Sequence, residues 1–227
     1  MSSVDKNGAA GLFSVTPMNV VRCGIGDDAV RMEMPPRGDV HLWCMHRGRA
    51  EVDDATLSLE EKERALRFRL PQDANRYRWT RCMLRRILAG YVGVEAQAME
   101  FAADELGKPH LSHPPTRLQF NLSHSGEVLL VGVAGGQPVG VDVEWMKPCA
   151  LFREIARRCF VPEIADAVTN ERQFFEAWTR MEACLKGQGL GIAKGARSAV
   201  PAGWEVRSVE IGPGYVGAVA LGHEEQA

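Results

Sequence analysis

The sequence lacks the features that would assign it to several broad classes of protein. Its six cysteines form no C-x-x-C pair and no cluster with histidine, a pattern typical of reduced thiols in a cytoplasmic protein. No stretch approaches the roughly 20 consecutive apolar residues of a membrane span, and the first 21 residues lack the charged start and apolar core of a signal peptide. Neither sign of charge is in excess, since 27 Lys and Arg against 29 Asp and Glu give a net charge of −2. General nucleic-acid binders are basic, so we expect a soluble cytoplasmic protein that binds neither membranes nor nucleic acids.

What the sequence does contain is the composition of a globular protein of one or two domains. The chain has 227 residues, of which 45% are apolar and 25% charged. Residues 1 to 38 show no sustained periodicity and form an extension with one expected strand near 18–21. Ser58-Leu59-Glu60-Glu61 has the form of a capping box and predicts a helix that runs to Leu66. A longer helix is predicted over 73–89, after the interruption at Pro71.

The remaining elements follow from short apolar runs and turn residues. A strand is predicted at 40–45, extended segments at 101–103 and 119–122, and a linker at 111–116 between them. The run 128–134 and the run 139–144 predict a hairpin across Gly135-Gly136-Gln137-Pro138. Three helices are predicted at 151–160, 162–168 and 172–186, and a closing hairpin at 204–211 and 215–221.

An internal repeat suggests that the fold is duplicated. Trp79-Thr80-Arg81 in the second helix recurs as Trp178-Thr179-Arg180 in the last helix, an offset of 178 − 79 = 99. At this offset the early strand also aligns with the strand at 139–144. We therefore predict an α+β pseudodimer with an N-terminal extension (1–38), a first half (39–116) and a second half (117–227).

Two carboxylates distinguish the second half. Asp142 and Glu144 alternate with valines in Val139-Gly140-Val141-Asp142-Val143-Glu144, so they project from one face of the strand while the valines bury the other. Trp43 and Met45 occupy these positions in the first half. The pair is either the solvated outer face of a half-exposed strand or a site for a hard cation such as Mg²⁺, which prefers carboxylate oxygens.

The last helix and two turns supply further candidates. Glu182 and Lys186 lie one helical turn apart, beside an apolar stripe of Phe174, Trp178, Met181 and Leu185. They form either a surface pair or a third metal ligand with a cation for an anionic substrate. Glycines 187, 189 and 191 then either end the helix or admit a ligand. Ser123-His124-Ser125 could donate hydrogen bonds to phosphate, and Gly107-Lys108-Pro109 is a weaker candidate; each also fits an ordinary polar turn.

Taken in order, these motifs resemble the Sfp-type 4′-phosphopantetheinyl transferases. The resemblance rests on Gly107-Lys108-Pro109, Asn121-Leu122-Ser123-His124-Ser125, Gly140-Val141-Asp142-Val143-Glu144 and Trp178-x-x-x-Glu182-x-x-x-Lys186, and it covers about residues 40 to 221. It implies a pseudodimer of two α+β halves with the active site between them. The implied reaction transfers phosphopantetheine from coenzyme A to a serine of an apo acyl or peptidyl carrier protein and releases adenosine bisphosphate. One chain suffices for one site, so a monomer is expected.

The resemblance also implies roles for single residues. Asp142, Glu144 and Glu182 would hold Mg²⁺, with Glu182 or a metal-bound water taking the serine proton. Ser123 and His124 would contact phosphate oxygens, and Lys186 the pyrophosphate. The nucleotide would be bound by Arg64, by Arg76 in Asp73-Ala74-Asn75-Arg76, and by the turn of Gly107 and Lys108. Catalysis would be mainly positioning and electrostatics.

Two positions depart from the family pattern. Met181 stands where the family motif W-x-x-K-E has a lysine, and the neighbouring Arg180 is a candidate to replace the lost charge. Glu61 stands where the family usually has a basic residue. These departures motivate an alternative, a non-catalytic paralogue that binds coenzyme A or carrier protein. A nucleic-acid module built on the basic segment 76–86 is a second alternative, which the net charge disfavours.

Overall fold

The computed structural model describes residues 19–23, 31–48, 52–190 and 200–223. A first sheet is formed by β1 (Asn19–Cys23), β2 (Asp39–His46), β5 (Leu118–Ser125) and β6 (Val128–Gly135), in the order β1-β2-β6-β5. β1 runs parallel to β2, and the other neighbours are antiparallel. The strand expected in the extension is therefore present as β1, at the sheet edge.

A second sheet is formed by β7 (Val139–Trp145), β9 (Tyr215–Gly222) and β8 (Trp204–Gly212), in the order β7-β9-β8 and antiparallel throughout. Between β7 and β8 the described residues form three helices, α3 (Phe152–Cys159), α4 (Pro162–Ala167) and α5 (Glu171–Gly187). The first half carries α1 (Leu59–Leu66) and α2 (Pro71–Val92), the short 3-10 turns η1 (Asp54–Thr56) and η2 (Ala96–Ala98), and a two-stranded ribbon of β3 (Glu100–Ala103) and β4 (Pro109–His113).

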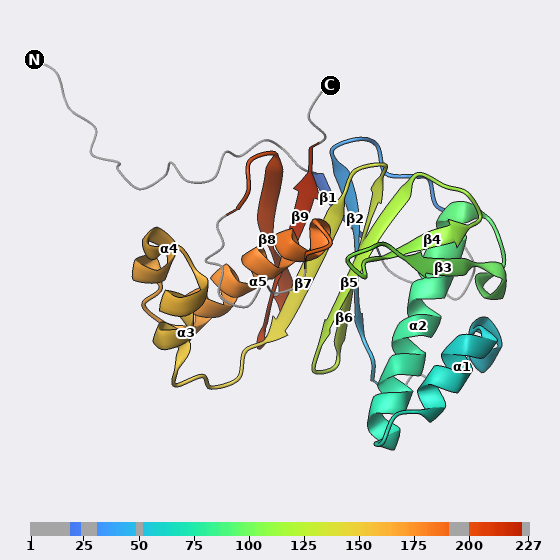
Figure 1. Ribbon diagram of the computed structural model, residues 1–227, viewed down its shortest axis with the longest axis horizontal. Helices are drawn as coiled ribbons and strands as arrows, with labels where there is room; N and C mark the ends of the chain where they lie inside the picture. The colour runs from blue at the N-terminus through green and yellow to red at the C-terminus, as the bar shows by residue number, and fades with distance from the viewer. Residues whose placement is uncertain (1–18, 24–30, 49–51, 191–199, 224–227) are drawn as a thin grey trace, which may run out of the picture.

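The molecule is built in four layers, helix, sheet, sheet and helix (Figure 1). The outer face of the first sheet packs against α2 through Trp43, Trp79, Leu84, Phe120 and Val131. The inner faces of the two sheets meet in a second apolar cluster that includes Val40, Leu130 and the three valines of β7. α5 covers the outer face of the second sheet, with α3 and α4 beside it. Within the described part of the chain, no helix is both long and apolar enough to cross a bilayer.

The predicted duplication is confirmed by the order of elements. Each half consists of a strand, a long helix and a hairpin whose last strand pairs with the first, as β2-β6-β5 and β7-β9-β8 show. The closing strands β6 and β9 both have 8 residues, at an offset of 215 − 128 = 87. The strand–helix offset of 99 is larger because the first half contains the additional β3–β4 ribbon between its helix and its hairpin.

Two predictions about the sheets are wrong. β6 and β7 do not form a hairpin, because β6 pairs with β2 and β5 while β7 pairs with β9, so the connecting turn crosses from one sheet to the other. The segment expected as a linker at 111–116 contains the end of β4. β5 and β6 complete the first sheet, so the chain crosses from the first sheet to the second between Gly135 and Val139.

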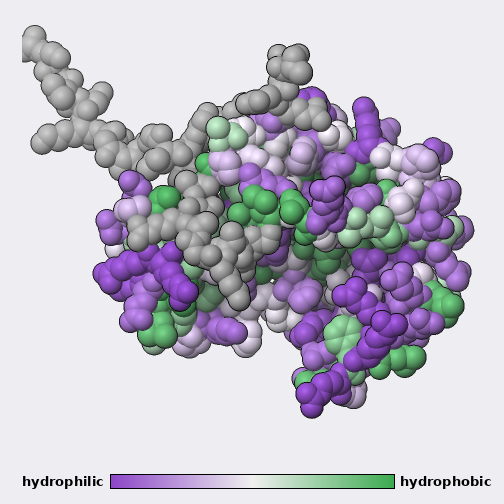
Figure 2. Space-filling view, viewed as in Figure 1, coloured by the Kyte–Doolittle hydropathy of each residue, from purple (hydrophilic) through white to green (hydrophobic). Residues whose placement is uncertain are grey.

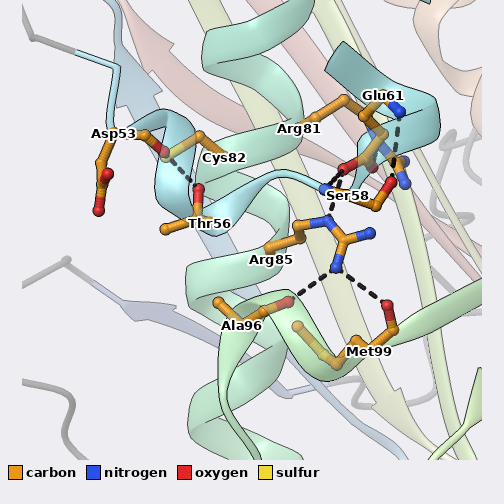
Figure 3. A network of polar contacts seen from close by, with 9 residues as sticks. All are labelled: Asp53, Thr56, Ser58, Glu61, Arg81, Cys82, Arg85, Ala96 and Met99. Carbon is orange, nitrogen blue, oxygen red and sulfur yellow. Dashed lines mark hydrogen bonds and ion pairs between the residues drawn. The ribbon is translucent and has the colours of Figure 1, made fainter. Parts of the chain in front are cut away.

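The predicted capping box at the start of α1 is confirmed and extends into a buried charge cluster (Figure 3). The Ser58 hydroxyl accepts the Glu61 backbone N–H, and the Glu61 carboxylate accepts that of Ser58. The same carboxylate accepts hydrogen bonds from Arg81 at 2.5 Å and Arg85 at 2.7 Å. Arg85 is 2% exposed and also donates to the carbonyl oxygens of Ala96 and Met99. Glu61 thus ties α1 to α2, which explains an acidic residue where a basic one is usual.

Candidate functional site

The two packed sheets converge along their edge strands β5 and β7, which lie side by side at the centre of the molecule (Figure 1). No backbone pairing joins these described strands. Instead, alternate side chains of β5 accept the edge N–H groups of β7: Asn121 Oδ1 accepts from Val141 at 2.9 Å, Ser123 Oγ from Val143 at 3.4 Å and Ser125 Oγ from Trp145 at 3.0 Å. We call this set of three contacts the seam ladder. It satisfies backbone donors that burial would otherwise leave unpaired.

The predicted carboxylates lie at this seam. Asp142 is 2% exposed, and its Oδ1 accepts hydrogen bonds from Ser123 Oγ at 2.8 Å and from Lys186 Nζ at 2.6 Å. Glu144 Oε2 accepts one from Ser125 Oγ at 2.9 Å. The interpretation of β7 as a half-exposed strand with a solvated outer face is therefore wrong. α5 covers the face that carries Asp142, and the first sheet covers the valine face.

The third predicted carboxylate, Glu182, comes from α5 together with Lys186. α5 begins at an Asn170 cap, whose side chain accepts the Gln173 N–H, and packs closely on β7. Gly140 permits this approach, because a Cβ there would lie 1.9 Å from the Ala183 carbonyl oxygen. Glu182 is 7% exposed, so the pair with Lys186 is not an ordinary surface pair. Lys186 Nζ also donates to Ser123 Oγ at 2.9 Å.

Burial disfavours the charged state of all three carboxylates, and repulsion from neighbouring carboxylates adds to this effect for Glu144 and Glu182. Burial raises the pKa of Asp142 against the opposing effects of Lys186 and Ser123. Burial also raises the pKa of Glu144, with a contribution from Asp142. The pKa of Glu182 rises to about 7 because of burial and the negative charges of Asp142 and Glu144, partly offset by Lys186.

Two carboxylate oxygens in this cluster, Asp142 Oδ2 and Glu182 Oε1, are buried without a hydrogen-bond partner. Such atoms are costly unless a cation or donor compensates them, and their oxygen chemistry fits Mg²⁺. Among the described residues, no three His, Cys, Asp or Glu side chains stand close enough together to hold a metal as they are placed here. The Lys186 ammonium instead supplies positive charge beside Asp142. The chemistry of these oxygens thus fits a divalent cation, which would either share the carboxylates with the Lys186 ammonium or displace it.

His124 points to the other side of β5 from Ser123, as alternation along a strand requires. Partial burial lowers its pKa, and the positive charges of Arg76 and Lys186 lower it further, which places both cations near its ring. Arg76 extends from the start of α2 and forms an ion pair with Asp73 at 2.8 Å. The structure therefore brings His124, Arg76 and Lys186 together, whereas the buried Ser123 hydroxyl is already bonded within the protein.

The other predicted nucleotide contacts lie further out. The Arg64 guanidinium stacks over the Tyr77 ring at 5.5 Å and lines an open pocket with Arg67 and Phe68. Gly107 turns the β3–β4 ribbon with a φ of 87°. Lys108 donates to the Val139 carbonyl oxygen at 3.2 Å and to that of Gly187 at 2.6 Å, so it bridges the ribbon to the second half. Its pKa is lowered by burial. Contact of Arg64, Gly107 and Lys108 with coenzyme stays a prediction.

Neither Met181, which stands in place of the family lysine, nor its neighbour Arg180 faces the carboxylates. Met181 packs in the apolar cluster of α3, α4 and α5 at 9% exposure. Arg180 is two residues from Glu182, about 200° around the helix, and its charge interacts with Cys184 and Glu176. The suggestion that Arg180 compensates at the site therefore has no support in this arrangement. Of the glycines after Lys186, Gly191 lies outside the described residues.

Sequence reasoning missed Asn121 as a residue of the site and considered Ser125 only as a possible donor to phosphate. Both belong to the motif that carries the resemblance, but only the central serine and histidine take roles from it. The signal was present, because residues 121, 123 and 125 alternate on one face of a strand just as 140, 142 and 144 do. What the sequence lacks is the information that these two faces meet.

Comparisons with known proteins cover nearly all of this region. Residues 43–136 match the family model described as 4′-phosphopantetheinyl transferase, N-terminal, and residues 138–222 match the 4′-phosphopantetheinyl transferase superfamily. The chain is 38% identical over 168 residues to the 4′-phosphopantetheinyl transferase HetI of Nostoc sp., an alignment that covers 69% of this chain and 71% of the relative.

Two further relatives carry the same description. AcpT of Escherichia coli is 36% identical over 143 residues, which is 60% of this chain and 69% of AcpT. Sfp of Bacillus subtilis is 29% identical over 143 residues, which is 60% of this chain and 62% of Sfp. The point where the two family models adjoin, between residues 136 and 138, coincides with the crossing from the first sheet to the second.

Proposed function

The chain belongs to the 4′-phosphopantetheinyl transferase superfamily, and we propose that it transfers the 4′-phosphopantetheine group of coenzyme A to a serine of an apo acyl or peptidyl carrier protein. In this reaction the serine oxygen forms a bond to the phosphorus that carries pantetheine. The bond from that phosphorus to the leaving phosphate breaks, and adenosine bisphosphate departs. The observation that carries the proposal is the cluster of buried Asp142 and Glu182 with half-buried Glu144 and Lys186, at the seam of a duplicated fold.

The acidic part of the cluster is proposed to hold Mg²⁺ through Asp142, Glu144 and Glu182. A bound Mg²⁺ would neutralise charge on the pyrophosphate of coenzyme A. The support from this chain is the pair of unpartnered oxygens, Asp142 Oδ2 and Glu182 Oε1. Holding these atoms in place costs little further ordering, because the seam ladder and α5 already fix both backbones.

The basic part of the cluster is proposed to bind the phosphates. The positive charges of Arg76 and Lys186 both act on the His124 ring. With a divalent cation at Asp142, the Lys186 ammonium is free to turn to a pyrophosphate oxygen, a charge-assisted contact. His124 is proposed to donate to a phosphate oxygen, and Arg76 to the ribose phosphate.

The serine proton needs an acceptor. The Glu182 carboxylate is proposed for this role through the oxygen that does not hold the metal, while a metal-bound water is the alternative. Cys82, Cys149, Cys159 and Cys184 form no disulfide, which supports a reducing, cytoplasmic setting. The proposed site residues come from both halves of the chain, and we propose a monomer as the active unit.

The experiment is to incubate the protein with Mg²⁺, coenzyme A and an apo carrier protein and to weigh the carrier by mass spectrometry. We expect the carrier to gain one phosphopantetheine group, with no gain when Mg²⁺ is chelated or when the carrier serine is replaced by alanine. The Glu182→Gln variant is expected to bind coenzyme A but to transfer poorly. An unchanged mass for several acyl and peptidyl carriers, with coenzyme A still bound, would instead favour the non-catalytic paralogue.

A further inference from the structure

The seam ladder has a feature that ordinary strand pairing lacks, because two of its three side chains, those of Ser123 and Ser125, also contact carboxylates. Ser125 Oγ accepts the Trp145 backbone N–H at 3.0 Å and donates to Glu144 Oε2 at 2.9 Å. One hydroxyl from the first half therefore touches both the backbone and the side chain of consecutive residues in the second half. The third contact, from the Val141 N–H to Asn121 Oδ1, involves the β7 backbone and no carboxylate.

The direction of the Ser125 hydroxyl hydrogen follows from these two contacts. A backbone N–H is only a donor, so the serine oxygen must accept from Trp145 and its own hydrogen must point to the carboxylate. Ser123 makes the equivalent contacts to Val143 and Asp142, but its oxygen is shared with the Lys186 ammonium. Within the described part of the chain no ammonium donates to Ser125. A substitution at this residue therefore tests its contacts with Trp145 and Glu144 without disturbing a lysine.

The geometry points to Ser125 as a positioning residue for Glu144: its hydroxyl couples the closure of the seam between the two halves to the orientation of a metal-binding carboxylate. This inference rests on the proposed role of Glu144 as a ligand. A carboxylate on a flexible side chain loses rotamer freedom when it binds a cation. The Ser125 hydrogen bond restricts that freedom beforehand, which is the usual effect of residues behind the ligands of a metal site.

The test uses three variants of the full-length protein. Ser125→Ala removes the hydroxyl, Ser125→Thr keeps it, and Ser208→Ala removes an exposed strand serine in the second half as a matched control. The first readout is the affinity for Mn²⁺, measured from the free-ion electron paramagnetic resonance signal with and without coenzyme A. The second is the rate of amide hydrogen exchange at Trp145.

We expect Ser125→Ala to weaken Mn²⁺ binding about 10-fold or more and to accelerate exchange at Trp145. Ser125→Thr should restore both readouts, and Ser208→Ala should change neither. Faster exchange at Trp145 with unchanged Mn²⁺ affinity would overturn the proposal, because the serine would then join the halves without positioning Glu144. The same conclusion would follow if Ser208→Ala weakened Mn²⁺ binding equally.

Neither readout requires transfer to a carrier protein. A wild-type protein that binds Mn²⁺ but modifies no carrier would contradict the proposed function while the Ser125 proposal could still be upheld. Conversely, normal carrier modification together with unaltered Mn²⁺ affinity in Ser125→Ala would overturn the positioning role alone.

Discussion

The Glu61 charge cluster (Figure 3) allows a stability prediction that does not depend on activity. Glu61→Gln keeps the shape of the side chain but removes the charge that faces Arg81 and Arg85. Breaking a buried ion pair costs about 3 to 5 kcal/mol. Arg85 retains two carbonyl acceptors, and the Arg81 side chain is 16% exposed and can turn to water, so we expect the lower end of that range.

For a chain of this size each kcal/mol lowers Tm by about 2 to 4 °C. A cost of about 3 kcal/mol therefore predicts a fall of about 6 to 12 °C in thermal unfolding followed by circular dichroism. Glu60→Gln is the matched control, because Glu60 is the neighbouring exposed residue in α1 and forms no ion pair with a described residue. Equal falls in Tm for the two variants would refute the conclusion that the buried ion pairs of Glu61 with Arg81 and Arg85 stabilise the fold.

The pH dependence provides a second check on the same variant. Burial, the largest influence, raises the pKa of Glu61, but Arg81, the Ser58 N–H and Arg85 together outweigh it, so the pKa is lowered. A carboxylate with a lowered pKa stabilises the fold above its unfolded pKa of about 4.3 and loses this contribution as the pH falls through the folded value. The difference between wild type and Glu61→Gln should therefore be constant near neutral pH and shrink below about pH 4.

Three further predictions concern the seam and the thiols. Asp142→Asn should raise the Mg²⁺ concentration needed for carrier modification by at least about 100-fold, since mutation of residues that merely hydrogen-bond a metal ligand already lowers metal affinity about 10- to 100-fold. If the variant needed no more Mg²⁺ than the wild type, the cation would have to bind elsewhere. Lys108→Met should lower Tm by removing the bridge to the second half, with Lys62→Met as control, and equal Tm values would contradict the bridge. Burial raises the pKa of Cys184 to about 12, so at pH 8 about one thiol in 10⁴ is ionised and native Cys184 should resist iodoacetamide until denaturant is added; rapid labelling of the native protein would contradict this.

Local signals in the sequence were sufficient to predict most of the helices and strands, but not β4, part of which was expected to be a linker. The capping box at Ser58 and the alternation in β7 each depend on residues only a few positions apart. The sequence pattern predicts an interruption at Pro71, whereas Pro71 is the first residue of α2. The duplication was also visible, because the W-T-R offset compares the sequence with itself. The buried stripe of α2, with Met83, Leu84 and Ile87, follows from the same helical periodicity.

Strand partners and burial of charge could not be predicted in the same way. The turn at 135–138 has the residues of a hairpin turn, and nothing local indicates that the chain there changes sheets. The burial of Asp142 depends on α5, which follows β7 only after α3 and α4, and on β5, which precedes it by a whole strand. Lys108 and Glu61 carry charges typical of a surface, and only the completed packing shows that each is enclosed by partners.

The seam ladder also has a consequence for the order in which the protein is made. During synthesis, the first sheet is complete once β6 has emerged, so Asn121, Ser123 and Ser125 already line its open edge when β7 appears. The partner of β7 within its own sheet, β9, is made only after α3, α4, α5 and β8. Until then, the first half is the only surface available to bury the β7 valines and accept its N–H groups. We therefore expect the first half to act as a template on which the second half folds.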